Sequence, residues 1–242
     1  AMLVAAKEAN FDILTLTVDT ITGGNRERDI KTGFTSPPTL TPKSVLSFAT
    51  HPNWTMNYLL REKFTLPQLN DYVDEGSNIS VSVGDYFSNM LDQSMNWEDA
   101  AELREKWGGK FCLKGIMSKG DARKAVQIGA NGIMISNHGG RQLDGSRAPF
   151  DQISEIAETV GDEIDIILDG GIRRGTHVLK AIAAGATACS GGRMYLYALA
   201  AAGQAGVERA LENMRNEIER DMKLMGISSI SELNRNLLSK RT

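Results

Sequence analysis

Short apolar runs alternate along the chain with segments whose apolar residues recur every three or four positions. Apolar, β-branched runs that end in polar groups are typical of buried parallel strands. Five such runs predict strands that begin at Phe11, Lys110, Gly132, Ile164 and Thr187. Segments with helical spacing predict helices over 97–107, 121–128, 151–160 and 176–184. Repeated strand–helix units require a parallel sheet, which is either a barrel or a doubly wound sheet.

Polar residues at the carboxyl ends of the strands favour the barrel. The functional groups of a (β/α)8 TIM barrel gather at that end of its strands. The chain of 242 residues places five polar residues there, namely Asp19, Lys114, His138, Asp169 and Arg193. Because five of eight strands are readable, we expect a barrel that lacks its N-terminal part. Residues 1–242 then form one partial barrel, with an insertion over 35–95 after the first strand.

Glycine-rich turns follow the last two predicted strands. Residues 169–175 read Asp-Gly-Gly-Ile-Arg-Arg-Gly, and residues 191–193 read Gly-Gly-Arg. Backbone N–H groups at a helix N-terminus, with guanidinium groups beside them, suit a phosphate. The alternative interpretation is a pair of ordinary tight turns with arginines on the surface.

A second candidate site lies after the third predicted strand. His138 is one of three histidines, and Arg141 follows it across two glycines. A base beside a fixed cation suits an anionic substrate that loses a proton. A hydrogen-bonded loop histidine beside a solvated arginine is the alternative.

The amino-acid composition indicates which classes of binding partner and which cellular compartment to expect. The net charge of −3 and the dispersed basic residues argue against nucleic acid. The two cysteines lack the spacing of metal ligands, so we expect no metal and a reducing, cytoplasmic location. No apolar run reaches the length of a membrane span, and no signal-peptide pattern is present. Scattered apolar and aromatic residues over 39–93 indicate core packing or a lid, with peripheral contact at the inner face of a membrane as the sharper alternative.

Residues 136–144, Ser-Asn-His-Gly-Gly-Arg-Gln-Leu-Asp, carry a specific resemblance. They resemble the signature of the FMN-dependent α-hydroxy-acid oxidising family, which includes glycolate oxidase, L-lactate dehydrogenase, lactate oxidase and mandelate dehydrogenase. The similarity covers nearly all of the chain and continues through 17–19, 26–29, 113–115, 169–175 and 192–193. Residues 50–54 and the length of the insertion are most similar to the bacterial lactate and mandelate dehydrogenase branch.

The resemblance implies catalytic and substrate-binding roles. His138 would be the base that starts oxidation at the substrate's hydroxyl-bearing carbon, and Asp19 would hold its imidazole. Arg26 and Arg141 would bind the substrate carboxylate. Lys114 would place a positive charge beside the flavin ring.

The resemblance also implies a set of FMN-binding residues. Besides Lys114, Thr17 and Ser136 would hydrogen-bond the flavin and Asp169 would bind its ribityl chain. The glycine-rich turns would hold the phosphate through Gly171, Arg173, Gly192 and Arg193. The implied partners are a small 2-hydroxy acid, an electron acceptor that is a quinone, a cytochrome or oxygen, and further copies of the chain in a homo-oligomer.

The chain departs from the family pattern in two places. Family members have about a third of the fold ahead of the strand near Phe11, including three strands and a substrate-binding tyrosine. Residues 189–191 are Cys-Ser-Gly where the family usually has bulky aliphatic residues. The first departure leaves a second hypothesis, an inactive barrel fragment that acts only in binding or assembly. A third hypothesis is another FMN- or phosphate-binding barrel enzyme such as an isomerase, which has no need of two carboxylate-binding arginines.

Overall fold

The computed structural model describes residues 2–33, 40–61 and 91–239. The chain divides into two compact units, one made of residues 1–25 with 92–242 and the other of residues 26–91. We describe each unit by itself.

A parallel sheet of five strands, in the order β1-β2-β3-β4-β5, forms the centre of the larger unit. All five strands predicted from the apolar runs are confirmed, and their bounds fall within two residues of the expected ones. The strands are β1 (Ile13–Thr17), β2 (Lys110–Lys114), β3 (Gly132–Ser136), β4 (Asp165–Asp169) and β5 (Ala188–Ser190).

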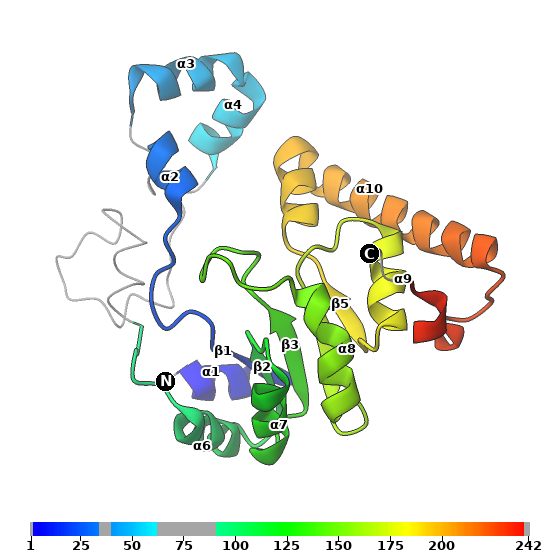
Figure 1. The fold of residues 1–242 in the computed structure, drawn as a ribbon. Helices are drawn as coiled ribbons and strands as arrows, with labels where there is room; N and C mark the ends of the chain where they lie inside the picture. The colour runs from blue at the N-terminus through cyan, green and yellow to red at the C-terminus, as the bar shows by residue number, and fades with distance from the viewer. Residues whose placement is uncertain (1, 34–39, 62–90, 240–242) are drawn as a thin grey trace. The chain divides into compact units, whose positions relative to one another are not determined.

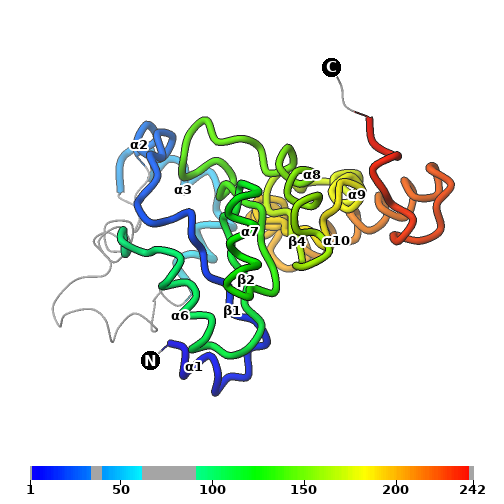
Figure 2. The backbone as a smooth tube through the Cα atoms, turned by 60° about the horizontal axis from the view of Figure 1, so that its bottom comes forward, coloured from blue at the N-terminus to red at the C-terminus, as the bar shows by residue number. Residues whose placement is uncertain are grey.

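Helices follow the strands in chain order and cover one face of the sheet. The covering helices are α6 (Trp97–Trp107), α7 (Lys119–Gln127), α8 (Pro149–Val160) and α9 (Gly175–Ala183). Figure 1 shows them in sequence from α6 on the left to α9 on the right, and Figure 2 shows the same backbone turned by 60°. Their apolar faces pack on strand residues that are at most 1% exposed, namely Phe111, Leu113, Ile133, Ile135, Ile166 and Leu168.

Local signals explain where these helices begin and end. Asn96 accepts hydrogen bonds from the first-turn N–H groups of α6, and left-handed Gly108 ends that helix. Pro149 starts α8 two residues before the predicted position, because proline suits the first helical residue. Side chains alternate along the strands, so the helix-facing apolar residues leave Thr17, Lys114, Ser136 and Asp169 for the opposite face.

The chain continues from β5 into α10 (Arg193–Met225), which packs against α9. Ala202 and Gly203 have non-helical dihedral angles, and Gly203 has φ 60° and ψ −142°. This break divides α10 into two helical segments. Three short elements complete the larger unit, namely α1 (Met2–Glu8), η2 (Ile230–Glu232) and η3 (Arg235–Leu237).

The smaller unit contains α2 (Glu27–Thr32), α3 (Pro42–Thr50) and α4 (Pro52–Leu60). Phe48, Trp54 and Tyr58 stack in a row, with ring centroids 5.3 Å and 5.2 Å apart. Several large apolar side chains of α3 and α4 are exposed, among them Leu46, Trp54, Leu59 and Leu60. Residues 35–39 and 62–90 of the predicted insertion lie outside the described residues. No helix in the described part of the chain is long and apolar enough to cross a membrane.

Candidate active site

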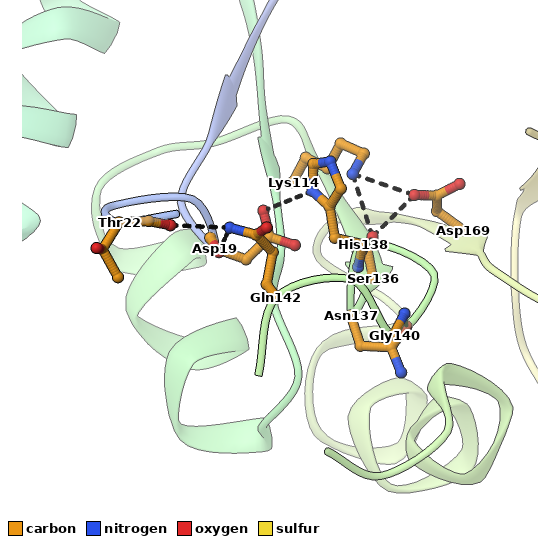
Figure 3. A network of polar contacts seen from close by, with 9 residues as sticks. All are labelled: Asp19, Thr22, Lys114, Ser136, Asn137, His138, Gly140, Gln142 and Asp169. Carbon is orange, nitrogen blue, oxygen red and sulfur yellow. Dashed lines mark hydrogen bonds and ion pairs between the residues drawn. The ribbon is translucent and has the colours of Figure 1, made fainter. Parts of the chain in front are cut away.

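Three polar side chains meet at the carboxyl ends of the central strands. The Lys114 ammonium, at the end of β2, donates to the Ser136 hydroxyl at 3.1 Å and lies 3.2 Å from the Asp169 carboxylate. The Ser136 hydroxyl donates to Asp169 at 2.8 Å. Figure 3 shows these contacts as dashed lines joining residues of three neighbouring strands. The structure therefore brings together three of the residues predicted to bind the flavin.

His138 lies in the loop that follows β3, beside a carboxylate from the loop after β1. Its imidazole Nδ1 donates to Asp19 Oδ1 at 3.3 Å (Figure 3). Its backbone N–H donates to the Ser136 hydroxyl at 3.1 Å, although its φ of 56° lies in the left-handed region that non-glycine residues rarely adopt. The Asp19 side chain is 14% exposed and the His138 side chain 33% exposed. With Nδ1 donating to a carboxylate, Nε2 keeps its lone pair and can act as a base.

The side chain of Arg193, the first residue of α10, contacts the backbone of the loop that carries His138 (residues 137–148, here called the histidine loop). The Arg193 guanidinium donates to the carbonyl oxygen of Gly139 at 2.6 Å. A Cβ at Gly139 would lie 2.5 Å from Arg193 Nη2, and the φ of Gly139 is 68°. Glycine at this position therefore serves both the turn and the approach of the arginine.

Gln142 is a functional candidate that sequence reasoning missed. Its amide Nε2 donates to the carbonyl oxygens of Asp19 at 3.3 Å and Thr22 at 3.1 Å (Figure 3). It thereby ties the histidine loop to the loop that carries the carboxylate partner of His138. The residue lies inside the 136–144 signature, but its partners are more than a hundred positions away in the sequence, and no local pattern indicates such a contact.

The remaining predicted site residues lie at the same end of the sheet or in the smaller unit. Thr17 is paired in register with Lys114. Arg141 follows His138 in the same loop and is exposed. Arg26 directly precedes α2, as its N-terminal capping residue, and belongs to the smaller unit. Its role beside Arg141 stays a prediction.

The two glycine-rich turns carry exposed arginines. Gly171 and Arg173 lie between β4 and α9, Gly192 lies between β5 and α10, and Arg193 is the first residue of α10. A Cβ at Gly171 or Gly192 would have no atom within 4 Å, so open space adjoins the backbone at both turns. That space and the two guanidinium groups suit an anion.

The cysteines and the acidic side chains show no sign of a metal centre in the part of the chain that is described, where no cluster of three histidine, cysteine or carboxylate groups could hold a metal ion. Burial raises the pKa of the Cys112 thiol and of the Cys189 thiol to about 11 each. Both thiols are free and stay protonated at neutral pH.

Comparison with known proteins identifies the family. The profile of the FMN-dependent dehydrogenases matches residues 1–240. The chain belongs to the FMN-dependent dehydrogenase family. The resemblance given by the 136–144 signature is thereby confirmed, and FMN is the cofactor of this family.

Curated members of the family are similar over almost the whole chain. The L-lactate dehydrogenase of Xanthomonas euvesicatoria pv. vesicatoria is 40% identical over 241 residues, which is 99% of this chain. The L-lactate dehydrogenase of Pseudomonas syringae pv. syringae is 38% identical over 239 residues, which is 98% of this chain. The chain spans 62% of the length of each of these relatives.

Solved structures of the family share the fold. A structure of the monotopic membrane protein (S)-mandelate dehydrogenase matches with a TM-score of 0.89 at 33% identity, over 99% of this chain and 63% of its own. A flavocytochrome b2 with sulfite bound matches with a TM-score of 0.73 at 32% identity, over 98% of this chain and 50% of its own. Both are FMN-dependent TIM-barrel enzymes, so the predicted α/β class and barrel type are confirmed.

Proposed function

We propose that this chain takes part in the FMN-dependent oxidation of a lactate-like L-2-hydroxy acid to the 2-oxo acid. The observation that carries the proposal is the His138–Asp19 pair at the carboxyl ends of the strands, beside the Lys114–Ser136–Asp169 cluster. L-lactate dehydrogenases among the relatives support the substrate class.

The described residues fit FMN. Lys114 supplies a fixed positive charge at the centre of the strand ends, where it would lie beside the flavin ring. Thr17 lies beside it on the neighbouring strand β1, and Asp169 on β4 pairs with its ammonium across β3. The open glycine turns with Arg173 and Arg193 would hold the phosphate. The Ser136 hydroxyl already donates once and accepts twice, so a bond from it to the flavin requires one of these contacts to be given up.

Oxidation of a 2-hydroxy acid removes two protons and two electrons from the hydroxyl-bearing carbon and its oxygen. When bound, FMN would supply the acceptor for the two electrons and for one of the two protons. His138 Nε2 would take the other proton, and Asp19 would stabilise the imidazolium that results. The electrons then leave to a quinone, a cytochrome or oxygen.

Arginine suits the recognition of the substrate carboxylate. A guanidinium group offers two parallel N–H donors to one carboxylate, which lysine cannot do. We assign this role to Arg141, three residues after His138. The family resemblance implies the same role for Arg26. Arg141→Lys is expected to raise KM for L-lactate and lower kcat together, as steady-state kinetics would measure. Unchanged constants would remove Arg141 from the substrate site.

Anaerobic titration tests the function directly. The chain is reconstituted with FMN, and its visible spectrum is recorded as L-lactate, L-mandelate or glycolate is added. Bleaching of the flavin by one of these acids, and not by acetate, is the expected result. A reconstituted protein that stays yellow with all three contradicts turnover by this chain.

A second candidate function is assembly without turnover. Within the described residues β1 and β5 are each paired on one side only, and strands with an unpaired edge associate readily. This candidate predicts that the chain binds no FMN and elutes from size exclusion as an oligomer. The homo-oligomer expected from the sequence is compatible with both candidates, so FMN binding separates them.

The smaller unit supports contact with a membrane surface. The exposed apolar residues of α3 and α4, with the stacked Phe48, Trp54 and Tyr58, have the composition of segments that lie at the boundary of headgroups and acyl chains. The solved (S)-mandelate dehydrogenase is itself named a monotopic membrane protein. Co-sedimentation with phosphatidylglycerol vesicles is expected and should fall in a Leu59→Asp, Leu60→Asp variant. Equal sedimentation of both proteins would exclude this surface.

A further inference from the structure

A carboxylate of α10 lies at the N-terminus of α9. Glu217 Oε2 accepts the backbone N–H of Gly175, the first residue of α9, at 2.8 Å. Its other oxygen, Oε1, pairs with Arg174 Nη1 at 3.1 Å. The Glu217 side chain is 21% exposed, whereas Arg174 is 69% exposed. One side chain therefore fixes the two consecutive residues at which the turn after β4 enters α9.

The helix backbones also touch at this point. A Cβ at Gly175 would lie 2.6 Å from the backbone nitrogen of Ile218 and 2.8 Å from the carbonyl oxygen of Met214. Only glycine allows α10 to approach so closely. The approach is visible in Figure 1, where α10 passes beside α9.

The fixed turn is the one assigned above to the FMN phosphate. It carries Gly171 and Arg173, and the backbone N–H of Arg173 donates to His177 Nδ1, in the first turn of α9, at 3.2 Å. Arg193, assigned to the phosphate in the other turn, is the first residue of α10. Helix α10 thus begins at one of the two predicted phosphate-binding turns, at Arg193. Its residue Glu217, 24 positions later, fixes the other turn.

We propose that Glu217 is a positioning residue for the FMN phosphate, acting through the backbone of the β4–α9 turn; the inference rests on the function proposed above. Glu217 makes no contact with the phosphate in this role. Its hydrogen bond to Gly175 holds the turn in the conformation that presents Gly171 and Arg173 to the anion. Groups that are held in place before a ligand arrives bind it with less loss of conformational entropy.

The opposite effect follows if Glu217 acts only through charge. A carboxylate near a phosphate repels it, and the ion pair with Arg174 withholds a guanidinium from the anion. Removing Glu217 would then strengthen FMN binding. Weaker FMN binding after removal of Glu217 therefore indicates a positioning role, and stronger binding indicates an effect of its charge.

Riboflavin provides the decisive comparison, because it shares the ring and ribityl chain of FMN and lacks the phosphate. We would measure the dissociation constants of FMN and riboflavin by quenching of flavin fluorescence in the whole chain. Loss of one hydrogen bond corresponds to a roughly fivefold change. Glu217→Ala is expected to weaken FMN binding by about that factor and to leave riboflavin binding unchanged. General loss of folded protein would weaken both ligands alike.

Three further variants complete the test. Glu217→Gln keeps an acceptor for the Gly175 N–H and should retain the wild-type preference for FMN. Glu217→Asp keeps the charge but withdraws the carboxylate by one methylene, and should lose the preference even if Glu217→Ala does not fold. Glu219→Ala, on the exposed side of α10 and paired with Arg215 at 2.9 Å, is the matched control.

Three results would overturn the proposed role of Glu217 or its basis. Glu217→Ala and Glu217→Asp variants that keep the wild-type preference, or that bind FMN more tightly, overturn the positioning role while the phosphate site stands. A glutamine variant as weak as the alanine variant overturns the hydrogen bond as its cause. A wild-type chain that binds riboflavin as tightly as FMN overturns the phosphate site itself, and this inference with it.

Discussion

Ser136 holds the polar cluster together at the scale of single residues. Its hydroxyl is fully buried, accepts from Lys114 and from the His138 N–H, and donates to Asp169. Ser136→Ala leaves these three groups without their common partner. We expect a loss of about 1–3 kcal/mol in the free energy of unfolding, because buried polar groups that lose a partner keep their desolvation cost.

Urea denaturation of the two proteins measures this loss. Ser154→Ala, on the exposed side of α8, is the control and should change the midpoint little. Equal stability of Ser136→Ala and wild type would show that the cluster contributes nothing to the fold.

His138 is the residue whose replacement should separate binding from chemistry. His138→Gln removes the base and leaves Lys114 and the phosphate turns in place. The rate of flavin bleaching by L-lactate should fall about 10²- to 10⁴-fold, the usual contribution of a general base, while FMN stays bound. Stopped-flow absorbance gives the rate, and His51→Gln in the smaller unit is the control. A variant that loses FMN instead would place His138 in the cofactor site.

At the scale of elements, the reactivity of two cysteine thiols measures how deeply their strands are buried. Cys112 lies in β2 and Cys189 in β5, and burial raises the pKa of each thiol from 9.0 to about 11. Only the thiolate reacts with iodoacetamide, so labelling at pH 8 should be about a hundredfold slower in the folded chain than in the chain unfolded in urea. Mass spectrometry follows both sites, and equal rates in the two states would contradict the burial.

The same thiols make stability depend on alkaline pH. Below pH 9 both thiols are protonated in the folded and the unfolded chain and have no effect. Between pH 9 and pH 11 the unfolded chain releases these protons first, so the fold loses stability as the pH rises.

The sequence predicts the elements well, because their causes are local. The strand Gly132–Ser136 and the helix Trp97–Trp107 have the predicted bounds, since an apolar run or a capped, periodic segment is complete within its own residues. The family resemblance also predicts the His138–Asp19 pair. The sequence does not predict the contacts of Gln142 and Glu217. Their partners lie in distant segments of the chain, which come close to them only in the folded structure.

At the scale of the whole molecule, the edges of the sheet govern behaviour in solution. Among the described residues β1 has a partner on one side only, and Ile13 on this strand is 52% exposed. We expect self-association that grows with protein concentration, and Ile13→Lys should reduce it, because a charged side chain on an edge strand opposes pairing with another chain. Light scattering after size exclusion measures the mass. A wild-type chain that stays monomeric at all concentrations would contradict this expectation.

The left-handed backbone of His138 has a consequence for how such a sequence changes over generations. A non-glycine residue at a φ of 56° costs roughly 1–2 kcal/mol relative to a conformation that its side chain prefers. Selection for folding alone would therefore favour glycine at position 138, because glycine adopts a positive φ without this cost. Histidine persists there only while its imidazole is needed. The identity of this one residue can thus distinguish, among copies of the gene, those whose chemistry is still maintained from those kept only as folded chains.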